Sequence, residues 1–321
     1  MKETTEVCLL CGNELIPILE RLWDDRFGAP GYYTIAKCRL CGTEQTSPRP
    51  SADVLRSLYE RYYNFGSNEI RGRKHYEKFR QRLVGSRLYR FWLLLDGDIS
   101  FHCVAANSIA AGKRLLDVGC NEGRGMEWFR ANGFEAEGLE LNRNAAETAR
   151  SRGFKVHAAS IEELRVDIPF NVIVFSNVLE HIENPRAVLR AANRLLDEGG
   201  EIWISLPNSG SIFRKIFGRS WINWHVPYHL VHFRSQTLLA LLRQENFTLH
   251  SCKSLTPALW IVQTVLAAMF ARPGVPTKQL RQMLVVTAGI ICVRFLFFPF
   301  LWLANVMHRG DALLIRARRV I

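Results

Sequence analysis

The sequence predicts an α/β protein built on an open parallel sheet with helices on both faces. The main observation is an alternation of short apolar segments and amphipathic segments between residues 113 and 255, which is typical of parallel strands joined by helices. Two further observations predict additions to this sheet. A pair of CxxC motifs lies near the N-terminus, and two long apolar segments lie between residues 254 and 307.

The first strand and helix of the sheet surround a glycine turn. Residues 114–118 form a short apolar run, Gly119 and Gly123 follow it, and residues 126–131 have the pattern of a helix. A second strand is expected at residues 134–139, with Glu140 at its end. Glycines let a backbone pass close under a nucleotide-like ligand, and a carboxylate about 20 residues further on accepts hydrogen bonds from a ribose diol.

This segment resembles motif I of class I S-adenosylmethionine (SAM) methyltransferases. Asp117, Gly119 and Gly123 match the family pattern, whereas Asn121 replaces its middle glycine. Asparagine tolerates the left-handed conformation better than most residues, so we expect the turn to survive. The resemblance implies a Rossmann-like seven-stranded sheet and SAM as cofactor. It assigns cofactor contacts to Asp117, Gly119, Cys120, Asn121, Gly123, Glu140, Leu141, Ser160, Ile161 and Asn177.

The remaining strands and helices follow the same alternation. Strands are expected at residues 155–158, 170–176, 201–206, 248–255 and 312–318, and helices at 143–151, 186–196 and 235–245. Ser160 occupies the place where the family has an acidic or polar residue beside the adenine. The run from Asn177 to Pro185 resembles the family motif that follows strand four.

Composition and charge limit the partners and the compartment. The net charge is +12, but the basic residues are dispersed and form no arginine-rich tract. A membrane surface or an acidic substrate therefore explains this charge better than nucleic acid does. Residues 1–6 are charged and lack an apolar core, so we expect no signal peptide and a cytoplasmic protein. The eight cysteines are then expected in a reducing compartment.

The two CxxC motifs predict a metal site. Cys8 and Cys11 are followed by Gly12, and Cys38 and Cys41 are followed by Gly42. Each CxxC-Gly can form a tight turn that offers two thiolates to one tetrahedral ion. We expect a structural zinc ion in a ribbon-like module of residues 1–48. A module without metal, or redox-active cysteine pairs, is the alternative. Residues 49–111 are expected to form helices, at 54–63, 69–95 and 99–110, that link this module to the sheet and cover it.

A segment rich in aromatic residues and histidines follows the fifth strand. Residues 207–233 resemble the substrate loop of methyltransferases associated with sugar and polysaccharide biosynthesis. A hydroxyl acceptor needs a general base, for which histidine is suited. The preferred candidate is His229, then His225, with His181 and His232 as further candidates. Ubiquinone-type O-methyltransferases have a Glu-x-x-Glu-His metal site after strand four. Because Asn177 replaces its first glutamate, no metal is expected there.

Residues 256–309 predict an apolar helical hairpin inserted before the last strand, so the methyltransferase domain comprises residues 112–255 and 310–321. Each arm is long enough to span a bilayer. However, Arg272, Lys278 and Arg281 would have to cross it, and Arg294 in mid-membrane would cost roughly 2.5–3.5 kcal/mol. We therefore expect a shallow hairpin at the cytoplasmic membrane surface, with Arg294 reaching the interface and Trp260 and Trp302 as anchors. Packing on the protein or on a second subunit is the alternative.

Together these observations predict a SAM-dependent methyltransferase that acts on a small-molecule or glycan acceptor. The acceptor class that we expect is a sugar hydroxyl of a lipid-linked or nucleotide-linked saccharide. Two alternatives are a sugar C-methyltransferase and a SAM-binding scaffold without activity at a membrane. A methyltransferase acting on nucleic acid is disfavoured, because residues 177–180 read Asn-Val-Leu-Glu in place of an Asn/Asp-Pro-Pro-Tyr-like motif.

Overall fold

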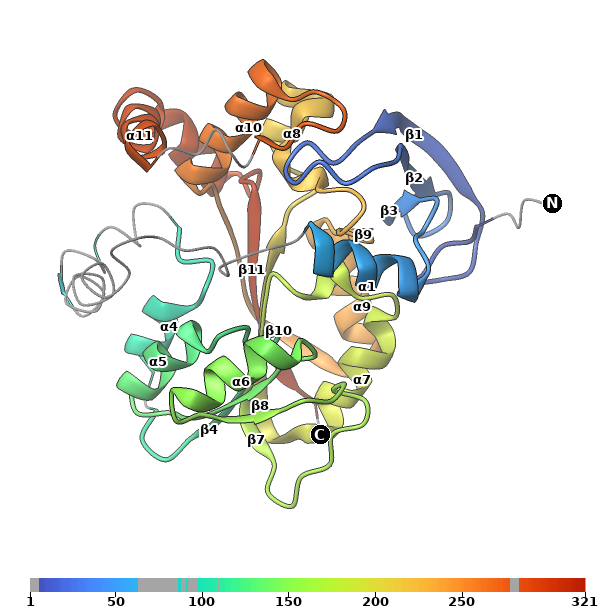
Figure 1. The fold of residues 1–321 in the computed structure, drawn as a ribbon. Coiled ribbons are helices and arrows are strands. Elements are labelled where there is room, and N and C mark those ends of the chain that lie inside the picture. Colours follow the sequence, from blue (N-terminus) through green and yellow to red (C-terminus); the bar gives the residue numbers. More distant parts are fainter. Residues whose placement is uncertain are drawn as a thin grey trace.

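A computed structural model describes residues 6–62, 86–87, 91, 97–108, 110–277 and 283–320. The helix expected over residues 69–95 lies almost entirely outside the described residues. The described chain folds around a large sheet, with a smaller sheet beside one end of it (Figure 1).

The large sheet has seven strands in the order β10-β11-β8-β7-β4-β5-β6. Its strands are β4 (Arg114–Val118), β5 (Glu135–Leu139), β6 (Lys155–His157), β7 (Phe170–Ser176), β8 (Leu196–Pro207), β10 (Phe247–Leu255) and β11 (Ala312–Arg319). β4 to β8 pair in parallel, whereas β11 pairs antiparallel with both β8 and β10. All seven expected strands are confirmed, and the fifth is longer than expected because it begins at Leu196.

Helices cover both faces because the strands of the sheet bury alternate residues on opposite sides. Leu115 packs in a cluster with Phe129 and Phe101, from α5 (Arg124–Ala131) and the segment that begins α4 (His102–Ala106). Leu116 packs on the other side with α7 (Pro185–Leu195) and α9 (Ser235–Gln244). α6 (Arg143–Ser151) lies beside α5, and the two helices share a smaller apolar cluster. The helix expected over residues 99–110 is shorter, because it covers only His102–Ala106.

The smaller sheet combines the N-terminal segment with a strand from the far part of the chain. Its order is β1-β2-β3-β9, with β1 (Leu15–Leu22), β2 (Tyr33–Cys38), β3 (Glu44–Ser47) and β9 (Val231–His232). α1 (Ala52–Arg61) follows this sheet and is capped by the Ser51 hydroxyl, which accepts from the Val54 amide at 3.4 Å. The pairing of β3 with β9 has no counterpart among the sequence expectations.

The segment between β8 and α9 carries the aromatic and histidine residues. It contains α8 (Ile212–Phe217) and the short 3-10 helices η2 (Gly218–Ser220) and η3 (Ile222–Trp224) before it reaches β9. A further 3-10 helix, η1 (Leu179–His181), follows β7. Asp311, directly before β11, holds the segment in place. Its Oδ1 accepts from Ser211 Oγ at 2.5 Å and from Trp221 Nε1 at 2.9 Å.

The apolar insertion forms α10 (Ala258–Phe270) and α11 (Met283–Val306) between β10 and β11. α10 packs on the globular part, so the expectation that Trp260 anchors in a membrane is wrong: its side chain is only 9% exposed. The expectation that Arg294 reaches a membrane interface is also wrong, because this residue is 8% exposed against the protein. Trp302 is exposed, as an anchor requires. Lys278 and Arg281 lie outside the described residues.

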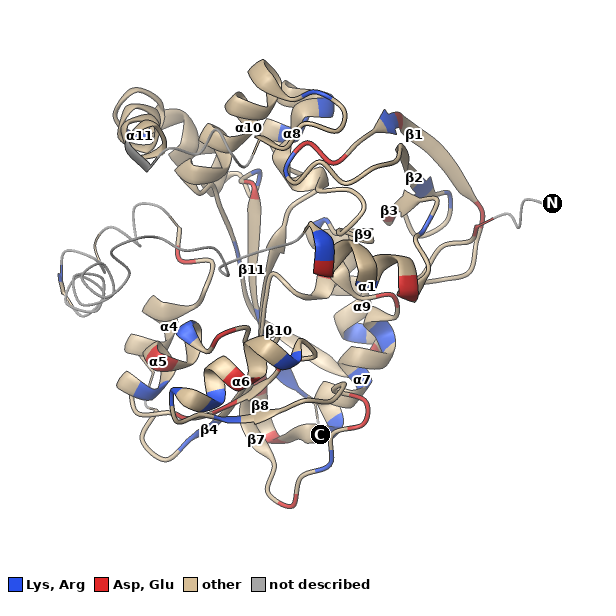
Figure 2. Ribbon diagram, viewed as in Figure 1, with Lys and Arg blue, Asp and Glu red and all other residues tan. Residues whose placement is uncertain are grey.

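α11 is the part of the insertion that remains exposed. Within the described ranges, the segment Val285–Val306 is the one helix long and apolar enough to cross a membrane. Its large exposed side chains include Phe295, Leu296, Phe297, Trp302 and Val306. Neither α10 nor α11 contains an acidic residue, and both are free of red in Figure 2.

Candidate functional site

The glycine turn lies at the carboxyl end of β4 and adopts the conformation that its sequence requires. Gly119, Asn121 and Gly123 have φ angles of 70°, 50° and 81°, all in the left-handed region. Asn121 therefore takes over the conformation of the family's glycine, as the sequence predicts. A Cβ on Gly119 would lie 2.8 Å from Val178 Cγ2, and one on Gly138 would lie 2.5 Å from Cys120 Sγ. The turn can therefore pack this closely only without those side chains.

Glu140 is held in position by the turn and by the next helix. Its Oε2 accepts from the Asn121 amide at 2.9 Å, and its Oε1 accepts from the Asn142 amide at 2.8 Å. Asn142 in turn caps α6 by accepting from the Ala145 amide at 3.2 Å. Each carboxylate oxygen keeps a further lone pair for a ligand hydroxyl, which is what a ribose diol requires. Leu141, beside Glu140, is 71% exposed.

Two acidic residues give this end of the sheet a negative character. Asp117 is buried, and burial together with the charge of Glu140 raises its pKa to about 7. Burial, with Asp117 and Glu140 nearby, also raises the pKa of the Cys120 thiol. A cationic ligand beside these groups would favour their ionised forms. The residues of the turn therefore fit SAM, whose sulfonium is positive.

The other expected cofactor residues follow neighbouring strands. Ser160 comes after β6, and its amide donates to Glu163 Oε2 at 3.3 Å. Ile161 beside it is buried in the core. Asn177 comes after β7 with a φ of 54°, and its amide donates to the Ser205 carbonyl at 2.9 Å. Because β4 to β7 are parallel, their carboxyl ends lie at one edge of the sheet, where α/β proteins of this kind bind ligands.

Three of the four candidate histidines meet beside η1. Nδ1 of His229 lies 2.8 Å from the Asn223 carbonyl, and its Nε2 lies 3.3 Å from His225 Nδ1. The rings of His181 and His229 have centroids 4.7 Å apart. A carbonyl can only accept, so Nδ1 of His229 carries the proton, and its Nε2 holds the lone pair that can accept from His225 Nδ1. The fourth histidine, His232, faces Thr46 instead, with Nε2 3.1 Å from the hydroxyl oxygen.

Glu180 closes this group, although the sequence analysis does not include it among the site residues. Its Oε1 lies 4.0 Å from His229 Nε2, and neither carboxylate oxygen has a hydrogen-bond partner among the described residues. Burial raises the pKa of Glu180 to about 8. Burial lowers the pKa of His181 to about 4 and that of His229 well below its ordinary value. Glu180, His181 and His229 are therefore mostly uncharged at neutral pH.

The same arrangement is also able to hold a cation. The ligand atoms of Glu180, His181 and His229 all lie within 4.8 Å of one another. Nδ1 of His181 lies 2.9 Å from the Tyr228 carbonyl, so that its Nε2 keeps a lone pair, as in His229. Histidine ligands of metals commonly donate their second nitrogen to a carbonyl in this way. His229, which comes from a distant segment, thus supplies a third potential ligand beside the Glu-His pair.

The four N-terminal cysteines form a second group. Sγ of Cys8 lies 3.5 Å from that of Cys41, and Sγ of Cys11 lies 3.4 Å from that of Cys38. All four sulfur atoms lie within 4.8 Å of one another. Gly12 and Gly42 have positive φ angles of 73° and 71°, so both CxxC-Gly turns are tight. Four converging cysteine sulfurs fit a tetrahedral zinc ion, which needs thiolates at about 2.3 Å.

The chain is similar to known methyltransferases. A family model described as "Methyltransferase domain" matches residues 76–252. The ubiquinone biosynthesis O-methyltransferase of Dechloromonas aromatica is 35% identical over 106 residues, which are 30% of this chain and 46% of that protein. The protein of the same name from Xanthomonas oryzae is 26% identical over 171 residues, which are 49% of this chain and 72% of that protein. The chain thus spans about half the length of the first of these relatives.

Two solved structures are similar to this chain. One is described as a putative sarcosine dimethylglycine methyltransferase from Galdieria sulphuraria, and the other is a SAM-dependent methyltransferase from Mesorhizobium loti. The first is 12% identical with a TM-score of 0.49, covering 74% of this chain and 89% of that one. The second is 18% identical with a TM-score of 0.45, covering 70% of this chain and 100% of that one.

Proposed function

Because the chain belongs to the methyltransferase domain family and is a class I SAM-dependent methyltransferase, we propose that it methylates a hydroxyl oxygen of a small-molecule acceptor. Bound SAM supplies an activated methyl group. The chain's own residues then have three tasks: they hold the cofactor, they orient the acceptor, and they receive its proton.

The cofactor task falls to the edge formed by β4, β5, β6 and β7. Glu140 would accept hydrogen bonds from the ribose hydroxyls, and the turn from Gly119 to Gly123 would pass under the cofactor. Ser160, Ile161 and Asn177 would line the adenine side. This proposal rests on Glu140, which two amides at 2.9 and 2.8 Å already hold in place.

The proton task falls to His229. Its Nδ1–H donates to the Asn223 carbonyl, so that Nε2 is the basic nitrogen. A proton taken up there lies 4.0 Å from the carboxyl of Glu180. The new positive charge favours ionisation of this carboxyl, which is mostly protonated before the transfer and whose charge then offsets that of His229. The low pKa of His229 keeps it in the neutral, proton-accepting form at pH 7. The position of Nε2 beside Glu180 is the observation that carries this assignment.

The acceptor is proposed to be amphipathic and to have a ring. Phe27 and Tyr228 lie beside His225, with ring centroids 5.5 and 5.0 Å away, and Tyr59 lies 5.2 Å from Tyr228. Aromatic walls beside a polar group favour a molecule with an apolar face and hydroxyls. The relatives' name favours oxygen as the methylated atom. A sugar hydroxyl of a lipid-linked or nucleotide-linked saccharide is the acceptor that we propose for this chain.

The location is proposed to be the cytoplasmic surface of a membrane, with α11 in contact with lipid. Its exposed phenylalanines and Trp302 are what supports this, together with the exposed cations Arg272 and Arg309. The four-cysteine group is proposed to bind one structural zinc ion, because four thiolates leave no position open for catalysis.

The test is methyl transfer from labelled SAM to three acceptors: a lipid-linked saccharide, a nucleotide sugar, and a hydroxylated aromatic ring with an apolar tail. Transfer to a saccharide supports the proposal, and transfer to the aromatic acceptor alone replaces the saccharide with that class. SAM binding without transfer to any of them would favour the scaffold alternative.

A further inference from the structure

The segment that carries His229 is attached to the cysteine module as well as to the large sheet. β3 follows Cys41 by three residues and pairs antiparallel with β9, with Glu44 opposite His232 and Gln45 opposite Val231. The Thr46 amide adds a hydrogen bond to the Leu230 carbonyl at 3.1 Å. The strand that carries His232 is thus the fourth strand of the N-terminal sheet.

Thr46 connects the two histidines of this strand region directly. Its hydroxyl lies 2.6 Å from the His229 carbonyl and 3.1 Å from His232 Nε2, and the residue is 1% exposed. A carbonyl oxygen can only accept, so the single hydroxyl hydrogen goes to His229. The oxygen must then accept from His232, which fixes the proton of His232 on Nε2. The Thr46 hydroxyl therefore positions the backbone of His229 and also determines the tautomer of His232.

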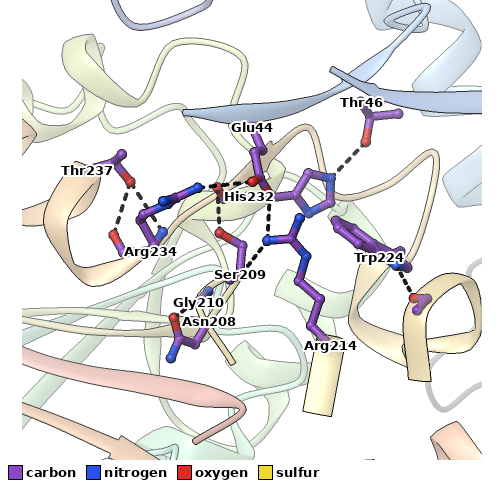
Figure 3. A network of polar contacts seen from close by, with 11 residues as sticks. Glu44, Thr46, Asn208, Ser209, Gly210, Arg214, Trp224, His232, Arg234 and Thr237 are labelled. Atoms are coloured by element: carbon purple, nitrogen blue, oxygen red, sulfur yellow. Dashed lines mark hydrogen bonds and ion pairs between the residues drawn. The ribbon is translucent and has the colours of Figure 1, made fainter. Parts of the chain in front are cut away.

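Glu44 holds the same segment at its two ends. Its Oε2 lies 3.0 Å from Arg214 Nη1, and its Oε1 lies 3.1 Å from Arg234 Nη2 (Figure 3). Arg214 belongs to α8 and Arg234 precedes α9, so the carboxylate joins the beginning of the histidine segment to its end. Glu44 is 2% exposed. Removing one partner of such an ion pair would strongly destabilise the fold, because it leaves a buried charge unpaired.

The cysteine turns set where β3 begins. The Cys38 amide donates to the Thr43 carbonyl at 2.8 Å, and Cys41 Sγ lies 3.2 Å from the Thr43 hydroxyl. Thr43 directly precedes Glu44, so whatever orders the four cysteines also orders the start of β3. The chain of contacts runs from the cysteines to Thr43, then along β3 to the backbone of His229.

From these contacts we propose that the cysteine module holds the histidine segment in place and that Thr46 is a positioning residue for His229. This inference rests on the proposed function, because it concerns the base of that reaction. Thr46 touches no acceptor in the proposal, and it acts by keeping Nε2 of His229 directed at Glu180. A metal on the four cysteines would therefore support catalysis by ordering β3 and positioning His229, without taking part in the reaction itself.

The first test compares Thr46→Val, which removes the hydroxyl at constant size, with Thr46→Ser, which keeps it. Thr34→Val in β2 is the matched control in the same sheet. We expect Thr46→Val to lower turnover about tenfold with unchanged SAM affinity, and to change the tautomer of His232 in nitrogen-detected NMR spectra. Thr46→Ser should keep both. An unchanged His232 spectrum in Thr46→Val, or the same change in Thr34→Val, would overturn the proposal.

The NMR spectrum requires no acceptor, so its outcome stands even if the proposed transfer reaction is not found. A second measurement tests the metal connection. In the double variant Cys8→Ser with Cys38→Ser, amide hydrogen exchange should accelerate at Thr46 and at Ser209, which donates to the Phe233 carbonyl at 2.7 Å. The Leu116 amide in β4 should keep its protection. Equal protection of Thr46 and Ser209 with and without the cysteines would show that the module does not order the segment.

Discussion

Nε2 of His229 lies 4.0 Å from Oε1 of Glu180, although the two residues come from different segments of the chain. Glu180 belongs to η1, which follows β7 at the cofactor edge of the large sheet, whereas His229 precedes β9 of the N-terminal sheet. The Leu230 amide also donates to the Glu180 carbonyl at 2.8 Å. The cofactor edge and the proposed acceptor segment are therefore joined at the residues proposed to move the proton.

His229→Ala should lower turnover roughly 10²- to 10⁴-fold, the usual worth of a general base, while SAM affinity stays the same. His250→Ala on β10 is the control, because His250 is exposed and distant in the sheet order. Turnover and calorimetry measure the two quantities. Metal content separates the base from a metal site on Glu180, His181 and His229. A base requires only the metal of the cysteine group, whereas a metal site would add a second equivalent. Normal turnover in His229→Ala would transfer the role to His225 or His181.

Glu140→Ala should weaken SAM binding about 10- to 100-fold, because two hydrogen bonds to the ribose are lost. The matched control is Glu147→Ala on α6, which is exposed. Calorimetric titration with SAM measures both affinities, and circular dichroism checks that the fold is intact. An affinity equal to that of the unmodified protein would remove Glu140 from the cofactor site.

Metal analysis of the freshly purified, reduced protein should find about one equivalent of zinc. The double variant Cys8→Ser with Cys38→Ser should lose it, because one thiolate from each CxxC turn is missing. Cys292→Ser on α11 is the control, since Cys292 is exposed and not part of the cysteine group. A zinc content near zero in the unmodified protein would support the alternative of a module without metal.

Asp311→Asn should change how stability depends on pH. Asp311 is fully buried, and burial raises its pKa from the ordinary 3.8 to about 6, although Ser211 and Trp221 donate to it. A raised pKa means that its contribution to stability is fully present below about pH 4 and is lost as pH rises through 6. The loss is at most about 3 kcal/mol.

Asparagine resembles the protonated acid and does not ionise. The free energy of unfolding of the variant, relative to that of the unmodified protein, should therefore be higher at pH 7.5 than at pH 4. Urea unfolding at several pH values measures the difference in the free energy of unfolding. The control is Asp197→Asn, an exposed residue after the start of β8. A difference that does not vary with pH would mean that Asp311 remains ionised in the folded protein.

The sequence predicts the parts of the fold that have a local pattern. Residues 114–118 and 170–176 are short, mainly apolar runs, so their strands could be located with correct bounds. The CxxC-Gly pairs and the left-handed turn at Asn121 also follow from local rules. These features need no knowledge of the remainder of the chain.

The contacts between distant segments could not be predicted in this way. β9 has only two residues, and nothing in its pattern names β3 as its partner. Glu180 lies in the recognised motif after strand four, but its approach to His229 depends on that pairing. Similarly, the apolar pattern of residues 254–271 is the same for a helix in lipid and for one buried on the protein. The buried residues of α10 show that this helix packs on the protein.

The last prediction concerns α11, whose exposed apolar surface requires a covering in water. Phe295, Leu296 and Trp302 are 83%, 69% and 56% exposed, and burying each such side chain contributes about 1.5–3 kcal/mol. A lipid surface with anionic headgroups fits this face, because Arg272 and Arg309 are exposed at the ends of the insertion and no acid lies between Asn246 and Gly310.

Replacing Phe295, Leu296 and Trp302 together by serine should release the protein from vesicles of phosphatidylcholine and phosphatidylglycerol. SAM affinity should stay unchanged, because these side chains are exposed and lie on the insertion. The matched control is serine at Ile18, Leu40 and Ile168, which are exposed on the N-terminal module and on the loop before β7. It should leave vesicle binding intact. Sedimentation with vesicles measures binding, and light scattering measures mass.

The contrary outcome is that the unmodified protein does not bind vesicles and forms a dimer, and that the triple serine variant is a monomer. This outcome would assign this face of α11 to a second subunit. The proposal of a lipid-linked acceptor would then lose its main support.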